Sequence, residues 1–144
     1  MKGSETSFSE ALGRAHAALL KDLSNLEEAA RASSGERSEE LRDRLEATLP
    51  EIAEHFRFEE QNGYLDSVRK GEPRLERTVQ QLALEHCQLM QSLNALLDRA
   101  KAGGSSDVKF KEEVRKWVQR VRLHEAHEND LVQDAFDFDV GAED

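Results

Sequence analysis

The sequence predicts an all-α protein folded as an up-down-up-down four-helix bundle. Four stretches carry apolar residues at helical spacing, glycine, proline or serine interrupts the chain between them, and β-branched runs that favour strands are few. Because the connections are short, consecutive helices should pack antiparallel. We expect one domain over residues 1–144, with helices at about 7–32, 36–70, 73–102 and 107–137.

The first helix is expected to begin at a capping box. Ser7 and Glu10 have the spacing at which each side chain satisfies a free backbone amide of the first turn. The helix should end before Gly35, since glycine readily adopts the left-handed conformation at a helix end. Its apolar face carries Phe8, Leu12, Leu19, Leu20, Leu23 and Leu26.

The second helix contains a proline. Pro50 lacks an amide hydrogen and its ring crowds the preceding turn, so we expect a kink or a break near Leu49. Gly71 should end this helix and Pro73 should begin the next. The apolar positions of the second helix are Leu41, Leu45, Ile52, Phe56 and Phe58.

The third and fourth helices are separated by a glycine-serine turn at residues 103–107, where Asp107 should cap the fourth helix. The acidic tail after Phe138 is expected to fray. The apolar positions of the third helix are Leu75, Val79, Leu82, Leu89, Leu93 and Leu97. Those of the fourth are Phe110, Val114, Trp117, Val121, Leu131 and Ala135.

Charge and cysteine content restrict the partners and the compartment. The net charge of −10 argues against nucleic acid and against an anionic membrane surface, both of which attract clustered Lys and Arg. No signal peptide opens the sequence and no apolar run is long enough to span a bilayer. Cys87 is the only cysteine, so no disulfide forms within the chain. We therefore expect a cytoplasmic protein.

One histidine in each helix falls on the apolar face. A helix turns by about 100° per residue, which brings each of these histidines within about 40° of core leucines. Two of them are followed four residues later by a glutamate on the same face. A single histidine on such a face is usually a packed core residue, but burying two carboxylates costs several kcal/mol each unless they are paired or bind metal. We predict a metal site formed by His16, His55, Glu59, His86, His124 and Glu128.

Other polar residues near these positions are weaker candidates. His127 lies about 60° round the helix from His124, at the edge of the core face, and we expect it not to bind metal directly, although it is the one candidate for an extra ligand. Glu60 and Glu125 are expected to be solvated. Cys87 is expected to be a buried, inert thiol.

The ligand types narrow the choice of metal. Imidazole and carboxylate without thiolate suit iron, manganese or zinc. Six ligands, including two carboxylates that can bridge, favour a pair of metal ions. The Glu-x-x-His pairs of ferritin-like bundles are absent, because no core histidine here has a glutamate three residues before it.

The order of these motifs resembles the hemerythrin-like, or HHE cation-binding, domain over nearly the whole chain. The motifs are His16, then His55-Phe-Arg-Phe-Glu59-Glu60, then Glu85-His86, then His124-Glu-Ala-His-Glu128. The resemblance implies a four-helix bundle with a non-haem di-iron centre. It also implies that His16 and His55 ligate one iron, that His86 and His124 ligate the other, and that Glu59 and Glu128 bridge them.

The sequence departs from the oxygen-carrying members of that family at two places. They have a His-x-x-x-His pair on the third helix, whereas Leu82 and Met90 flank His86 at these positions. They also have an aspartate five residues after the last histidine, where this chain has Asn129. One histidine ligand is therefore missing, or is replaced by water or by a residue such as His127, which leaves a coordination position open.

Three functions are compatible with these observations. The first is a di-iron protein that binds O2 or a related small ligand for storage or sensing. The second is a di-iron redox enzyme acting on peroxide, nitric oxide or ferrous iron. The third is a metal-free helical module that binds a protein partner of unknown identity. We favour binding over catalysis, because no proton-transfer residue beyond the ligands is evident on the core faces.

Overall fold

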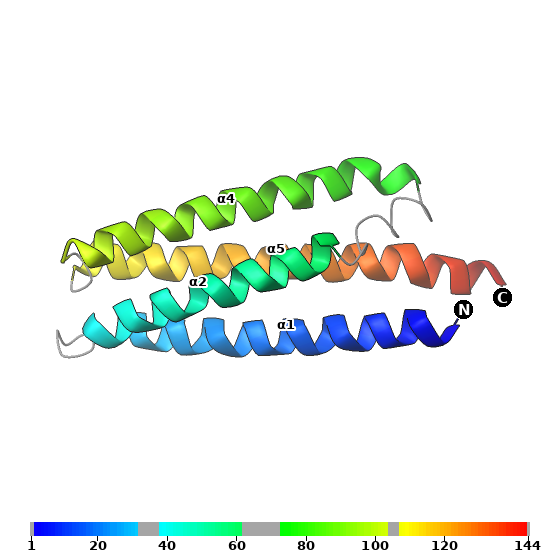
Figure 1. The fold of residues 1–144 in the computed structure, drawn as a ribbon. Coiled ribbons are helices and arrows are strands. Elements are labelled where there is room, and N and C mark those ends of the chain that lie inside the picture. Colours follow the sequence, from blue (N-terminus) through cyan, green and yellow to red (C-terminus); the bar gives the residue numbers. More distant parts are fainter. Residues whose placement is uncertain (1, 32–37, 62–72, 104–106, 144) are drawn as a thin grey trace.

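The computed structural model describes residues 2–31, 38–61, 73–103 and 107–143, and for residues 2–12 and beyond 134 it describes the backbone alone (Figure 1). The helices are α1 (Lys2–Arg31), α2 (Ser38–Gln61), α4 (Glu76–Lys101) and α5 (Val108–Glu143). A short 3-10 turn, η2 (Pro73–Leu75), precedes α4. The described residues contain no strand, which confirms the all-α prediction.

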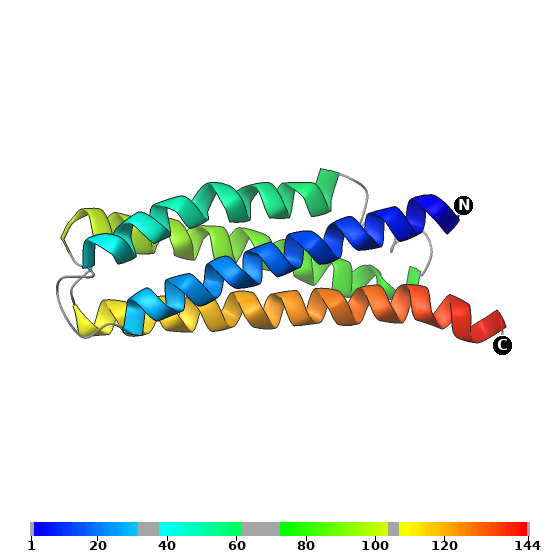
Figure 2. The same cartoon turned by 90° about the horizontal axis from the view of Figure 1, so that it is seen from below.

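The four helices form a bundle in which each packs on two neighbours. Helices α1 and α4 each contact α2 and α5. Figures 1 and 2 show that consecutive helices alternate in direction and that both chain termini lie at the same end. This arrangement is the predicted up-down-up-down bundle. That residues 1–144 fold as one domain stays a prediction.

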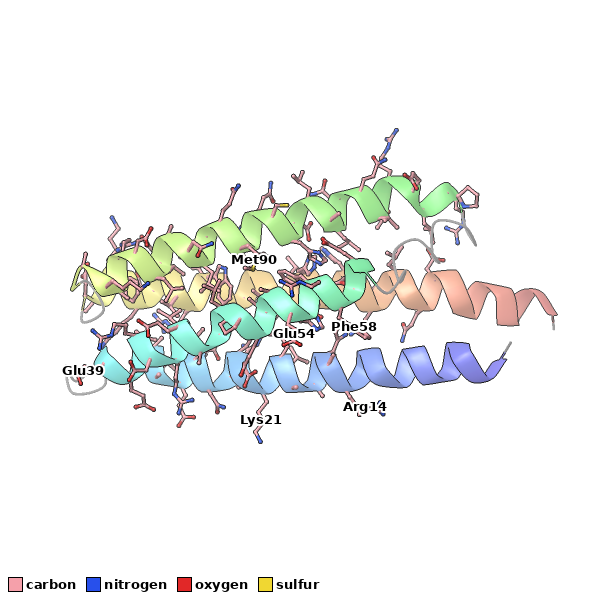
Figure 3. The ribbon with its side chains drawn as sticks, viewed as in Figure 1. Arg14, Lys21, Glu39, Glu54, Phe58 and Met90 are labelled. Atoms are coloured by element: carbon pink, nitrogen blue, oxygen red, sulfur yellow. The ribbon has the colours of Figure 1, made fainter. Side chains whose placement is uncertain are left out.

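Leucines fill the half of the bundle nearest the α1–α2 and α4–α5 connections. Leu23, Leu45 and Leu93 are fully buried there, and Trp117 joins α5 to α4 by donating its indole hydrogen to the Leu89 carbonyl at 3.0 Å. Polar residues cover the outside, and Figure 3 shows Arg14 and Lys21 pointing away from the bundle. Leu20, expected in the core, is 39% exposed, and Phe58 is only half-buried.

Helix α2 runs through Pro50 without the break expected near Leu49. Pro50 lies on the exposed side of the helix. The carbonyl that loses its hydrogen bond belongs to Glu46, which is also exposed, so water can satisfy it. The expected extension of this helix to residue 70 lies partly outside the described residues, because α2 is described only as far as Gln61.

Two helix ends differ from expectation and one agrees. Helix α1 begins at Lys2, so Ser7 and Glu10 lie inside it and do not cap it, since no proline in residues 2–6 stops the helix from extending. Helix α5 likewise continues past the expected end near 137 to Glu143. The turn before α5 is as predicted: Gly103 has a φ of 92°, and Asp107 Oδ1 accepts a hydrogen bond from the Lys109 amide at 3.2 Å.

Candidate metal centre

The four core histidines meet in the layer of the bundle next to the leucine core, one from each helix. His16 comes from α1, His55 from α2, His86 from α4 and His124 from α5, and each is at most 7% exposed. Glu59 on α2 and Glu128 on α5 are fully buried in the same layer. The structure therefore brings together all six residues that the sequence predicts as metal ligands.

Glu59 lies between the two pairs of histidines. Its carboxylate oxygens are 3.8 Å from His16 Nε2, 3.3 Å from His55 Nε2 and 3.5 Å from His86 Nε2. A carboxylate can use its two oxygens on different ions, so this position suits a bridge between two metals.

Glu128 lies on the side of His86 and His124. Its Oε1 is 2.6 Å from His124 Nε2 and 3.8 Å from His86 Nε2. Its ligand atoms also lie within 4.8 Å of those of His16 and Glu59, so it too reaches toward the other pair of histidines.

Several of these buried atoms lack a hydrogen-bond partner among the described residues. They are Nε2 of His16, His86 and His124 and both carboxylate oxygens of Glu59. An unsatisfied buried polar atom costs about 1–3 kcal/mol, more when it is charged. A divalent cation among them would satisfy nitrogen and oxygen atoms together, so the residues present fit a metal of the iron, manganese or zinc type. His16, His55 and Glu125 form one group that can hold a metal ion, and His86, His124 and Glu128 form another.

Neighbouring helices hold the outer nitrogen of three of the histidines. His86 Nδ1 donates to Glu60 of α2 at 2.9 Å, and His124 Nδ1 donates to Glu85 of α4 at 2.8 Å. His16 Nδ1 lies 3.1 Å from Asn129 Oδ1 of α5. A hydrogen on Nδ1 leaves the lone pair on Nε2, so these contacts orient each imidazole toward the centre as a ligand.

Phe56 of α2 separates the histidine layer from the leucine core. Its ring stacks on His86 with centroids 4.0 Å apart and meets His124 edge-on at 5.6 Å. The aromatic ring restricts rotation of both imidazoles and keeps water from that side.

Burial and neighbouring charges shift the pKa values of the site in a pattern that favours cation binding. Burial lowers the pKa of His86 and His124, and their bonds to Glu60 and Glu85 only partly oppose this, so both are neutral near pH 7 with a free lone pair. Burial raises the pKa of Glu59. These three groups can therefore accept a cation once Glu59 loses its proton.

His16 and Glu125 form a buried ion pair when no metal separates them. Burial lowers the pKa of His16, but Glu125 and Glu59 more than offset it and raise the value to about 10. Burial raises the pKa of Glu125, and His16 and His55 outweigh this and lower it to about 2.

The expectation that Glu125 is solvated was wrong. Glu125 is only 2% exposed, because α5 buries an arc wide enough to face both α1 and α4. The structure shows this arc as pairs of adjacent buried residues that recur every seven positions on the helix, and because Lys111 and Glu125 are charged, the sequence carries no apolar repeat that would reveal it. The pairs are Phe110 with Lys111, Trp117 with Val118, and His124 with Glu125.

The structure places three further residues named in the sequence analysis. The Glu60 side chain is 48% exposed, as expected, but it is not merely solvated, because it accepts the hydrogen bond from His86. Cys87 is exposed and not buried, since it lies about 100° round α4 from His86. His127 is exposed and belongs to none of the groups that can hold a metal, in agreement with its expected place at the edge. Leu82 and Met90 occupy the positions one turn from His86, so no histidine replaces the missing one there.

Comparison with known proteins agrees with this geometry. The family model of the hemerythrin HHE cation-binding domain matches residues 7–136, which include every residue of the histidine layer. Comparisons with curated proteins and with solved structures gave no significant match. No helix in the described ranges has an apolar stretch long enough to cross a membrane. With this bundle topology and with its histidines and glutamates in this order, the chain belongs to the hemerythrin HHE cation-binding domain family.

Proposed function

We propose that this protein binds two iron ions in the histidine layer and uses them to bind a small ligand such as O2. The observation that carries the proposal is the convergence of four buried imidazoles on two fully buried carboxylates, with several of their inward atoms unsatisfied. Membership of a cation-binding family supports it. Manganese or zinc would suit the same donors.

In this proposal His16 and His55 bind one iron, and His86 and His124 bind the other. Glu59 and Glu128 bridge them, which their short distances to histidines of both pairs support. The iron pair would supply an exchangeable coordination position and a source of electrons for a small ligand. Because every one of these residues is at most 7% exposed, a bulky substrate has no room beside the metals.

A redox enzyme acting on peroxide, nitric oxide or ferrous iron is the second candidate. It is favoured by the missing histidine beside His86 and by the third buried carboxylate, Glu125. Extra negative charge stabilises oxidised iron relative to reduced iron, and reversible oxygen carriage needs the reduced form. A metal-free interaction module is disfavoured, since buried polar atoms would then lack hydrogen bonds and no bound metal would compensate for the lost stability.

Metal analysis with an absorption spectrum before and after exposure to air tests the proposal. We expect two irons per chain and a spectrum that changes with O2. One zinc and no iron after iron-replete expression would contradict it. A spectral change with O2 that is stable and reverses when O2 is removed supports ligand binding. Turnover of added peroxide or nitric oxide supports the redox enzyme.

Paired variants on α5 provide the control. His124→Ala should lose iron, whereas His127→Ala should keep it, because His127 is exposed. Equal loss in both would show that His127 is the extra ligand. A cytoplasmic location and the absence of nucleic-acid binding stay predictions, which cell fractionation and a nucleic-acid binding assay would check.

A further inference from the structure

Among the described residues, Glu125 is the one buried carboxylate of the histidine layer to which the family resemblance assigns no metal. It is 2% exposed, and its oxygens lie 2.8 Å from His16 Nε2 and 3.2 Å from His55 Nε2. Two ligand atoms about 2.1 Å from one ion, at a right angle, are about 3.0 Å apart. The three side chains therefore have the spacing of ligands that share one metal.

The contact between His16 and Glu125 requires a cation between the two side chains. His16 Nδ1 faces Asn129 Oδ1, an acceptor, and therefore carries the hydrogen, so the lone pair of the neutral ring lies on Nε2. That Nε2 is 2.8 Å from a Glu125 oxygen and lacks hydrogen-bond alignment with it. Two lone pairs at this distance repel each other unless a cation lies between them, either a proton or a metal ion.

On the side of the other pair, Glu128 Oε1 lies 2.6 Å from His124 Nε2, but Glu128 also groups with His16 and Glu59, whereas Glu125 groups with His16 and His55 alone. The nearby Glu60 and Glu85 accept from the outer nitrogens of His86 and His124 and do not face the inner ones. With Glu59 and Glu128 shared, the two metal positions therefore differ by one protein ligand and one negative charge.

We propose that Glu125 is a terminal ligand of the metal held by His16 and His55, and that the coordination position open to a small ligand lies on the metal held by His86 and His124. This rests on the proposed pair of metals. A surface pocket of about 180 Å³, lined in part by Glu85, His124 and His127, lies outside the second position and shortens the path from solvent to it.

The substitution Glu125→Gln tests the ligand role, with Glu112→Gln on the exposed side of the same helix as its control. Titration with ferrous iron under anaerobic conditions should give two tight sites in the parent and the control. In Glu125→Gln one site should weaken by more than about 100-fold, beyond the 10–100-fold loss typical of a residue that only orients a ligand. Circular dichroism of the metal-free variant should show an intact bundle.

Binding of azide, a small anion, tests which metal has the open coordination position. Mössbauer spectra of the iron-loaded parent should show one doublet for each iron, and azide should shift only one of them. The doublet that azide leaves unchanged should be the one altered or lost in Glu125→Gln. If azide shifts that same doublet, the open position is on the Glu125 side and the proposal is wrong.

Unchanged affinity and spectra in Glu125→Gln would show that Glu125 is not a ligand while leaving the di-iron proposal intact. A parent protein that binds no pair of metals would instead overturn the proposed function itself, and with it the role of Glu125. The two failures are therefore distinguishable.

Discussion

At the scale of single residues, the site depends on which histidine nitrogen faces inward. Glu60, Glu85 and Asn129 each hold the outer nitrogen of a histidine from a neighbouring helix. Nε2 of a histidine held in this way already faces the centre, so binding a cation needs no rotation of the ring. His16, whose pKa is raised to about 10, must first release a proton.

Glu85→Gln tests this orientation. The amide keeps an acceptor for His124 but loses the charge, so we expect metal affinity at the His86–His124 position to fall by about 10–100-fold. Competition with a chelator would measure it. Gln88→Ala, an exposed position one turn away on the same pocket, should have no effect, and an equal loss there would point to a general change of α4.

Glu59→Ala and His16→Ala distinguish a bridge from a one-sided ligand. Glu59 approaches histidines of both pairs, so its loss should weaken both metals together. His16 belongs to one pair, so its loss should weaken one metal more than the other. Stepwise metal titration of the two variants checks this, and an equal effect of both substitutions would contradict the assignment.

At the scale of elements, α5 contributes most to the site, because the adjacent residues His124 and Glu125 are both buried and Glu128 follows one turn later. Its repeated pairs of buried residues place His124 in one of the groups that can hold a metal ion and Glu125 in another. Helix α2 contributes His55, Phe56 and Glu59 within about one turn, so its continuation past Pro50 matters for the site.

Pro50→Ala is predicted to stabilise α2. Alanine restores the hydrogen bond to the Glu46 carbonyl and has a higher helix propensity, which outweighs the greater freedom it gives the unfolded chain. We expect the free energy of unfolding of the metal-free protein to rise by about 1–2 kcal/mol. Denaturant unfolding followed by circular dichroism measures this, and a decrease would mean that the proline fits a bend that α2 needs.

At the scale of the whole molecule, stability should depend on metal and pH together. In the metal-free protein the pKa of His16 is raised from 6.5 to about 10, so its contribution to stability is complete below pH 6.5 and is lost as the pH rises toward 10. The raised pKa of Glu59 acts in the same direction. Bound metal replaces these protons, so metal affinity should instead increase over that range.

We therefore expect the metal-bound protein to melt well above the metal-free protein, with a gap that widens as the pH rises from 6.5. Thermal unfolding of both forms at several pH values measures the gap. In metal-free His16→Gln the decline of stability above pH 6.5 should be smaller. Equal melting temperatures with and without a chelator would show that these residues do not form a buried metal site.

The sequence by itself determined the bundle, the one core-facing histidine in each helix and the two His-x-x-x-Glu motifs, because helical periodicity fixes which residues share a face. It did not determine where α1 begins or that α2 continues past Pro50. Both depend on whether a backbone group without a helical partner is hydrogen-bonded by water or by another protein group. Tertiary structure alone decided that Glu125 is buried and that Glu60 and Glu85 hold histidines of other helices. These contacts join residues on different helices, so the rotation of one helix against its neighbours sets them, and no spacing along a single helix contains that information.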